Sequence, residues 1–191
     1  NEEYIPTKLR FTLNGVPTIL DSVGLKLRGN TSRRRPEGSP GQTHQLVNPD
    51  WNHSHFALDF EQYKAKQELR GLEKMVLKFA NNDPTYVREI YAYDLFRRFG
   101  VWTAPRASYC RLTIKVIGDA TAAYFGVYYM IENGDSDFVK YRKKEWGSTV
   151  GYLWKCLYNG GGPANLLNAY SVGIESVSLN PNTSQYYTYD L

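Results

Sequence analysis

The stretch DPTYVREIYAYDLFRRFG, residues 83–100, carries the strongest secondary-structure signal of the chain. Its apolar residues recur every three or four positions, the spacing that places side chains on one face of an α-helix. Asp83 is a favourable N-cap, Pro84 suits the first helical position, and Gly100 suits the position that ends a helix. Two Arg residues just before Gly100 complement the helix dipole. The stretch therefore predicts one principal helix.

Alternating segments on both sides of this helix predict strands. The dipeptide Asn14-Gly15 is the strongest two-residue hairpin signal, and it joins residues 8–13 to residues 17–20. Further strands are predicted at residues 23–28, 56–60, 75–79, 108–116, 124–132, 151–158 and 185–191. Strands surrounding a single long helix indicate an α+β fold, with a mixed, mainly antiparallel sheet and the helix packed on it.

Two shorter signals follow the sheet. Asp135-Ser136-Asp137 is a D-x-D pattern, which we interpret as the cap of a short helix over residues 137–142. Three consecutive Gly residues before Pro163 are expected to end regular structure.

Composition excludes several classes of protein. With 191 residues, 42% of them apolar, the chain suits one domain and is too apolar for disorder. No run approaches the roughly 18 apolar residues that a membrane-spanning helix needs. The net charge of +4 is mild and the basic residues are scattered, so we expect no nucleic-acid binding.

Aromatic residues are unusually frequent, with 16 Tyr, 8 Phe and 4 Trp. We expect core packing for those of the helix and of the strand at 124–132, namely Tyr91, Phe96, Phe99, Tyr124, Phe125, Tyr128 and Tyr129. The terminal cluster Tyr186, Tyr187 and Tyr189 is expected to form an exposed seam toward a further part of the protein. Cys110 and Cys156 are either two buried thiols or one disulfide.

Residues 30–55 form a long polar loop that contains all three His residues. Loops of this length are commonly functional or disordered. His44, His53 and His55 share the loop with Asp50, a set that could bind a metal, although the spacing matches no standard site and surface histidines are common. We therefore expect no metal site.

Two features suit phosphate chemistry. The loop Arg28-Gly29-Asn30-Thr31-Ser32 follows a strand and combines backbone freedom, hydroxyl groups and a guanidinium group, which can hold phosphate. Lys78 lies on a predicted strand and Glu89 on the helix, and such a pair clamps the nucleotide in kinase-like folds. Lys26 is an alternative strand lysine. A solvated turn and unrelated surface charges would explain the same residues.

Several segments in order resemble motifs of the CotH kinase family. LKLRGNTS at residues 25–32 resembles "lRGNtS", and the segments at 69–72 and 75–79 resemble "GLkkLnL". The helix is similar to "DPsllREklayDLf". Three later segments match further motifs, at residues 100–106 ("GvpaPr"), 125–132 ("yyGlYllvEqid") and 152–157 ("nLyKc").

The resemblance implies an atypical kinase-like fold that uses ATP and Mg²⁺ or Mn²⁺ to phosphorylate Ser or Thr of proteins, at an extracellular, spore or cell-surface location. It implies that residues 1–160 form the smaller lobe, with an insertion at 30–55, and that residues 161–191 are a Gly-rich linker and the start of the next region. By position, candidate nucleotide-binding residues are Lys26, Arg28, Gly29, Asn30, Thr31, Ser32, Lys78, Glu89 and, near the connection to the second lobe, Glu132.

The sequence departs from the family pattern in two places. The family strand "KKsYkikf" supplies lysines, whereas residues 53–60 contain none, and residues 37–51 lengthen the preceding loop. No "WDxDxxfG"-like motif for metal and the catalytic carboxylate follows residue 147. We therefore expect an inactive part of a kinase that lacks its C-terminal lobe. The alternatives are a non-catalytic module that binds a protein, coat, surface or carbohydrate partner, and an α+β domain without an active site.

Overall fold

A computed structural model describes residues 3–29, 53–81, 83–101 and 103–147, and the backbone of residues 154–156, 158–159, 162–163 and 186–188. The chain divides into two compact units, Asn1–Asn133 and Gly134–Leu191. The first unit contains the residues on which the functional interpretation depends. No helix of the described segments is long and apolar enough to cross a membrane.

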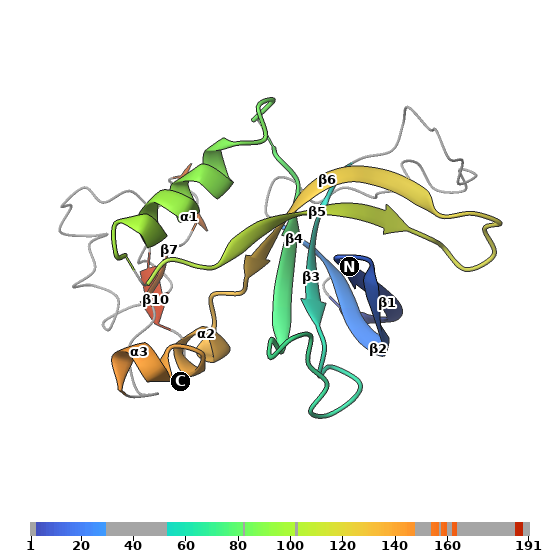
Figure 1. Cartoon of the computed structure of the whole chain (residues 1–191), viewed down its shortest axis with the longest axis horizontal. Helices are drawn as coiled ribbons and strands as arrows, with labels where there is room; N and C mark the ends of the chain where they lie inside the picture. The colour runs from blue at the N-terminus through green and yellow to red at the C-terminus, as the bar shows by residue number, and fades with distance from the viewer. Residues whose placement is uncertain are drawn as a thin grey trace. The chain divides into compact units, whose positions relative to one another are not determined.

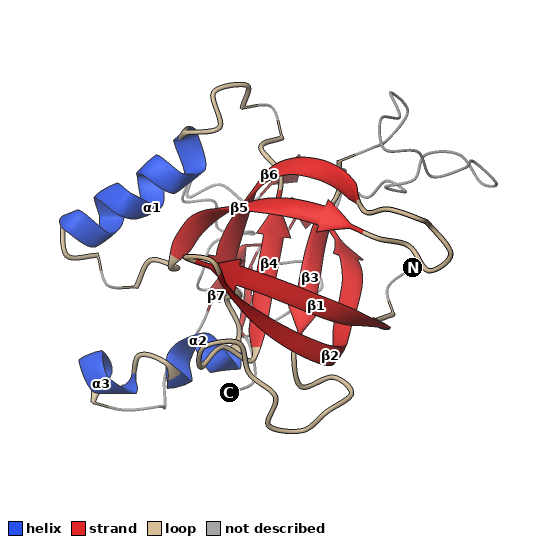
Figure 2. Cartoon of the chain, turned by 45° about the vertical axis from the view of Figure 1, so that its right-hand side comes forward, coloured by secondary structure: helices blue, strands red, loops and turns tan. Residues whose placement is uncertain are grey.

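Within the described residues, the first unit is built on a six-stranded sheet with one helix, and Figures 1 and 2 show their arrangement. Its strands are β1 Ile5–Leu13, β2 Val16–Arg28, β3 His55–Asp59, β4 Lys74–Lys78, β5 Ala107–Ile114 and β6 Ala123–Glu132. Their order is β1-β2-β3-β4-β6-β5, and each neighbouring pair is antiparallel. The helix, α1, spans Arg88–Arg98 between β4 and β5. The predicted α+β class is confirmed.

The first hairpin turns at Asn14 and Gly15, as predicted. Their φ angles are 51° and 80°, the left-handed region that a type I′ turn requires. Beyond the turn, β2 is one continuous strand rather than the two predicted segments. An irregularity in the register, between the pairs Leu9↔Leu20 and Thr7↔Val23, places two residues of β2 opposite one of β1. This β-bulge accommodates the break in the alternating pattern without ending the strand.

The sheet is curled, as Figure 2 shows, and the main hydrophobic core lies on one of its faces. Its members alternate along the strands with residues of the opposite face, because successive side chains of a strand point to opposite sides. They are Val23, Phe56, Leu58, Phe60, Leu69, Met75, Leu77, Ala123, Phe125 and Tyr128. A smaller cluster on the other face contains Val76, Tyr129 and Ile131, with Ile90 and Tyr93 of α1 packed against it. The sheet therefore positions α1 on the face opposite to the main core.

The start of α1 differs from the prediction. Asp83 is not the N-cap, because the helix begins at Arg88 and its N-cap is Val87. The Asp83 carboxylate nevertheless accepts a hydrogen bond from the backbone N–H of Arg88 at 2.9 Å. It also accepts one from the backbone N–H of Thr85 at 3.2 Å. Asp83 thus satisfies a free N–H of the first helical turn from five residues away, while the turn after Pro84 stays outside the helix.

The end of α1 is as predicted, since Gly100 follows the C-cap Phe99 and has φ 74°. The expected core packing of aromatic residues is only partly correct. Phe125, Tyr128 and Tyr129 are buried, but four residues are exposed: Tyr91 57%, Phe96 48%, Phe99 82% and Tyr124 49%. The reason is geometric, because α1 turns one narrow stripe toward the sheet, and Tyr124 points to the opposite side from Phe125.

Cys110 is a free, half-buried thiol, and the side chain of Cys156 lies outside the described residues. Burial raises the pKa of the Cys110 thiol to about 11.

The second unit contains helices α2 Ser136–Lys140 and α3 Lys143–Trp146. Asp135 caps α2 by accepting a hydrogen bond from the backbone N–H of Asp137 at 3.1 Å, which confirms the capping interpretation of the D-x-D pattern. Four short strands follow, β7 Trp154–Cys156, β8 Tyr158–Asn159, β9 Gly162–Pro163 and β10 Tyr186–Thr188.

Two of these strands bear on the predictions for the tail. Gly162 and Pro163 pair with β8, so the expectation that the Gly-rich run ends regular structure is wrong. The predicted terminal strand exists as β10, which pairs with β7.

Candidate functional site

Three polar side chains lie in a row across adjacent strands, near the ends of β2 and β4 and the start of β3. Arg28 of β2 is directly opposite His55 of β3. Phe56 of β3 is opposite Leu77 of β4, which places His55 next to Lys78. Opposite residues of an antiparallel pair share a face, and neighbouring strands are about 4.8 Å apart. The register therefore brings these three nitrogen-bearing side chains to one end of the sheet.

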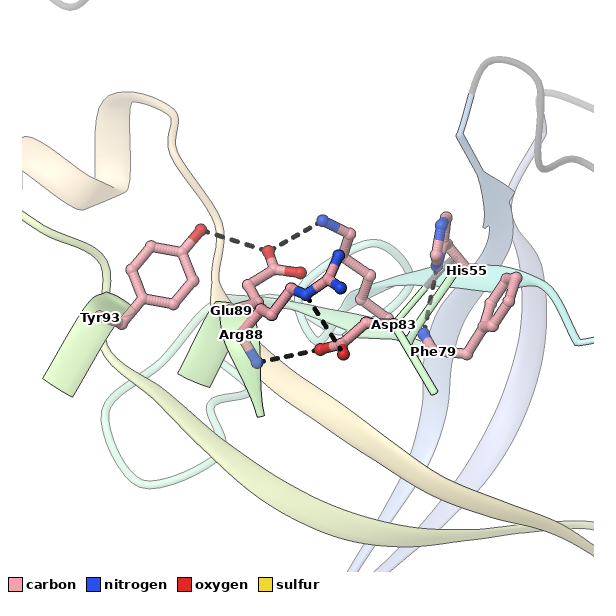
Figure 3. A network of polar contacts seen from close by, with 7 residues as sticks. His55, Phe79, Asp83, Arg88, Glu89 and Tyr93 are labelled. Carbon is pink, nitrogen blue, oxygen red and sulfur yellow. Dashed lines mark hydrogen bonds and ion pairs between the residues drawn. The ribbon is translucent and has the colours of Figure 1, made fainter. Parts of the chain in front are cut away.

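Lys78 and Glu89 form an ion pair between strand β4 and the first turn of helix α1. Figure 3 labels Glu89 together with Tyr93. Lys78 Nζ lies 2.8 Å from Glu89 Oε1, and the two side chains are 38% and 25% exposed. Tyr93, one turn further along α1, donates its hydroxyl hydrogen to the same Oε1 at 3.4 Å. Burial, followed by the charge of Glu89, raises the pKa of Tyr93, so this hydroxyl remains a donor. The pair holds the Lys78 ammonium at the sheet face.

Lys26, the alternative lysine, has a different environment. Its ammonium lies 4.3 Å from the centre of the Tyr4 ring, a cation–π contact at the start of the chain. Of the two strand lysines considered for the pair with Glu89, the structure thus brings only Lys78 to it.

Arg28 ends β2 immediately before the polar loop. Its Nη1 donates to Asn133 Oδ1 at 2.8 Å, which fixes the guanidinium against the last residue of the first unit. A guanidinium has five N–H donors, so further donors remain for a ligand. Gly29 follows with φ 115°, a conformation that residues with a Cβ rarely adopt. Asn30, Thr31 and Ser32, the other candidates of this loop, lie outside the described residues.

His55 is buried, with 7% of its surface exposed. Its Nδ1 accepts a hydrogen bond from the backbone N–H of Phe79 at 3.2 Å, and its ring stacks on the Phe79 ring with 4.6 Å between centroids (Figure 3). Burial, then the charges of Lys78 and Arg28, lower the pKa of His55 from 6.5 to about 4. The imidazole is therefore neutral at physiological pH.

The histidines do not assemble a metal site within the described residues, where no group of three His, Cys, Asp or Glu side chains could hold an ion. His53 Nε2 lies 2.8 Å from the backbone oxygen of Phe125 and is a hydrogen-bond partner of that strand. His44 and Asp50 lie outside the described residues.

Glu132 ends β6, one residue before the boundary between the two units. Its carboxylate is buried and accepts a hydrogen bond from the backbone N–H of Arg106 at 3.0 Å. This contact joins the segment that enters β5 to the end of β6.

The sequence motifs agree with one comparison. A family model described as CotH kinase protein matches residues 25–187. The chain belongs to the CotH kinase family. Among curated proteins and among solved structures, none matches the chain.

Within this CotH-family domain, the site offers donors for a polyanion. A guanidinium, a neutral imidazole and an ammonium bind phosphate oxygens well, and two of them carry positive charge. Sequence reasoning did not single out Asn133, Tyr93 or the placement of His55 between Arg28 and Lys78. The position of His55 directly opposite Arg28 is the signal that identifies it, and this register is visible only once the strands are paired.

Proposed function

We propose that this chain contains the ATP-binding part of a CotH-type atypical protein kinase, which transfers a phosphoryl group from ATP to Ser or Thr of a protein. The observation that supports it most strongly is the ion pair between Lys78 and Glu89. In protein kinases, a strand lysine paired with a glutamate of the following helix holds the phosphates of ATP. Here the same residue types occur on a strand and on the helix that follows it.

The order of the parts also supports the proposal. In kinases a flexible Gly-containing loop that covers the phosphates precedes the lysine strand. In this chain Gly29 follows the last residue of β2, and β3, β4 and α1 come later in the sequence. We assign the smaller lobe to residues 1–160 and the phosphate-covering loop to the segment that begins with Arg28 and contains Asn30, Thr31 and Ser32.

Three residues have separate roles at the proposed site. Lys78 neutralises phosphate charge, Glu89 holds the Lys78 side chain in place, and Arg28 adds a second cation beside it. The ATP supplies the transferable phosphoryl group. Among the described residues, no group of side chains is suited to hold Mg²⁺ or Mn²⁺. No metal ligand and no metal-dependent step are therefore assigned to them.

A second candidate is a non-catalytic module with a kinase-like scaffold that binds a protein partner at a spore or cell surface. The observation that favours it is the strand at residues 53–60, which lacks the lysines typical of the family. The same strand supplies His55 to the site instead, which keeps the ATP-binding proposal the stronger of the two.

Thermal unfolding of the chain with added nucleotide separates the two candidates. ATP with Mg²⁺ at a hundredfold excess over Kd should raise the free energy of unfolding by about 2.7 kcal/mol. AMP, which lacks the β- and γ-phosphates, should stabilise the chain less at the same concentration, because Lys78 and Arg28 meet those phosphates. Equal midpoints with ATP, with AMP and without nucleotide would leave the binding module as the better explanation.

A further inference from the structure

We infer that His55 is a phosphate-binding residue, which donates its Nε2 hydrogen to an oxygen of a bound oligophosphate between the Arg28 guanidinium and the Lys78 ammonium. This inference rests on the proposed nucleotide site and deepens it by naming a neutral donor within it. It concerns the oligophosphate group, which ATP and inorganic tripolyphosphate share.

The strand register places His55 at the centre of the site. Arg28 lies directly opposite on β2, and Lys78 lies next to it on β4. With about 4.8 Å between neighbouring strands, the three side chains form a short row rather than a dispersed set of charges. A chain of linked phosphates lying across these strand ends would meet the guanidinium, the imidazole and the ammonium in turn.

The hydrogen bond with Phe79 fixes which ring nitrogen carries the hydrogen. A backbone N–H is always a donor, so His55 Nδ1 must accept from Phe79 and cannot carry a hydrogen itself. The neutral ring therefore carries its hydrogen on Nε2. Among the described residues, the hydrogen bond from Phe79 to Nδ1 is the one hydrogen bond that the His55 ring makes. The hydrogen on Nε2 therefore has no acceptor among them. Stacking on the Phe79 ring restricts rotation of the imidazole, so the donor is held in one orientation.

Burial and the neighbouring charges keep the ring neutral. Burial lowers the pKa of His55 most, and the charges of Lys78 on β4 and Arg28 on β2 lower it further, while Glu89 of α1 is paired with Lys78. Protonation of Nδ1 would also break the hydrogen bond with Phe79. His55 should consequently donate to phosphate without change between about pH 6 and pH 9, whereas an ordinary surface histidine loses its charge across this range.

Calorimetric titration of the full chain with inorganic tripolyphosphate at pH 8 tests the inference. His55→Ala should weaken binding about tenfold or more, the loss expected for a hydrogen bond to a charged acceptor. His55→Gln retains an N–H donor and should bind within about threefold of the wild type. His53→Gln is the matched control, because His53 contacts a backbone oxygen outside the row, and it should leave the affinity unchanged. Equal affinities of the wild type and a folded His55→Ala variant would overturn the inference.

Nitrogen-15 NMR of the histidine side chains provides a measurement that needs no substitution. The His55 ring should show the Nε2–H form at pH 7, and its Nε2–H resonance should shift on addition of tripolyphosphate. An Nδ1–H form, or no shift at saturation, would contradict the inference. The ATP-binding proposal fails separately if tripolyphosphate binds through His55 but ATP does not displace it. If ATP binds through Lys78 with no effect of His55→Ala, only the inference fails.

Discussion

Lys78 at the end of β4 and Glu89 in the first turn of α1 are joined by a 2.8 Å contact between Nζ and Oε1. The two residues are eleven positions apart, and the segment between them contains the Asp83 turn that sets the start of the helix. The contact therefore links the position of α1 to the position of the site's ammonium group.

The strength of this link can be measured with a double-mutant cycle of Lys78→Met and Glu89→Gln. Both side chains are partly exposed, so we expect a coupling energy of about 0.5–1 kcal/mol. This value lies in the upper part of the range measured for ion pairs at protein surfaces. Urea unfolding of the four proteins gives this value. A coupling near zero would mean that the two charges do not hold each other in solution.

Asp83 should stabilise the helix although it is not the N-cap. Asp83→Ala leaves the backbone N–H groups of Thr85 and Arg88 without their carboxylate acceptor. We expect the unfolding midpoint to fall by about 2–4 °C, the shift that the loss of one such contact produces in a chain of this size. Asp94→Ala, which removes only exposed pairs with Arg97 and Arg98, is the control and should leave the midpoint unchanged. Equal effects of the two substitutions would refute the capping role.

Two phenylalanines test the division between buried and exposed aromatic residues. Phe56 is 3% exposed in the main core, and Phe99 is 82% exposed at the end of α1. Phe56→Ala should cost about 3–5 kcal/mol of unfolding free energy because it leaves a cavity, whereas Phe99→Ala should cost less than about 0.5 kcal/mol. Chemical denaturation of both variants checks this. A large loss for Phe99→Ala would show that α1 is covered in solution.

His55 should make the fold sensitive to acid. Its pKa is about 4 in the folded chain and about 6.5 when unfolded, so the unfolded chain binds more protons between these values. Its contribution to stability is therefore complete above about pH 6.5 and is lost as the pH falls toward 4. We expect a loss of about 2–3 kcal/mol by pH 4, because each unit of difference between the folded and unfolded pKa is worth about 1.4 kcal/mol. Unfolding free energies measured from pH 7 to pH 4 give this slope.

His55→Gln removes the titrating ring and should flatten that part of the pH profile. An unchanged slope in His55→Gln would assign the acid sensitivity to other groups.

Local signals in the sequence were sufficient for much of the fold. Asn14-Gly15 identified the first hairpin, and Gly100 identified the end of α1, because turn and cap geometry depend on adjacent residues. The start of α1 was placed too early at Asp83. A side chain that caps from outside the helix produces the same local pattern as an N-cap, and only the backbone path after Pro84 separates the two.

The site depended on contacts that no local pattern contains. Lys26 and Lys78 are equivalent by sequence, and the choice between them follows from the contact of Lys78 with Glu89, whereas Lys26 lies over the Tyr4 ring. By sequence alone, His55 is a candidate metal ligand or a surface residue. Its place between Arg28 and Lys78 follows from pairing with strands on both sides, and such long-range register is not encoded in the composition of one segment.

Calorimetric titration of the full chain with ATP and Mg²⁺ is the most direct test of the proposed site, with Lys78→Met and Lys26→Met measured beside the wild type. We expect the wild type and Lys26→Met to bind ATP with similar affinity, and Lys78→Met to lose at least about tenfold, since a charge-assisted contact is removed. Absence of ATP binding by the wild type, or a folded Lys78→Met variant that binds as tightly as the wild type, would contradict the proposal.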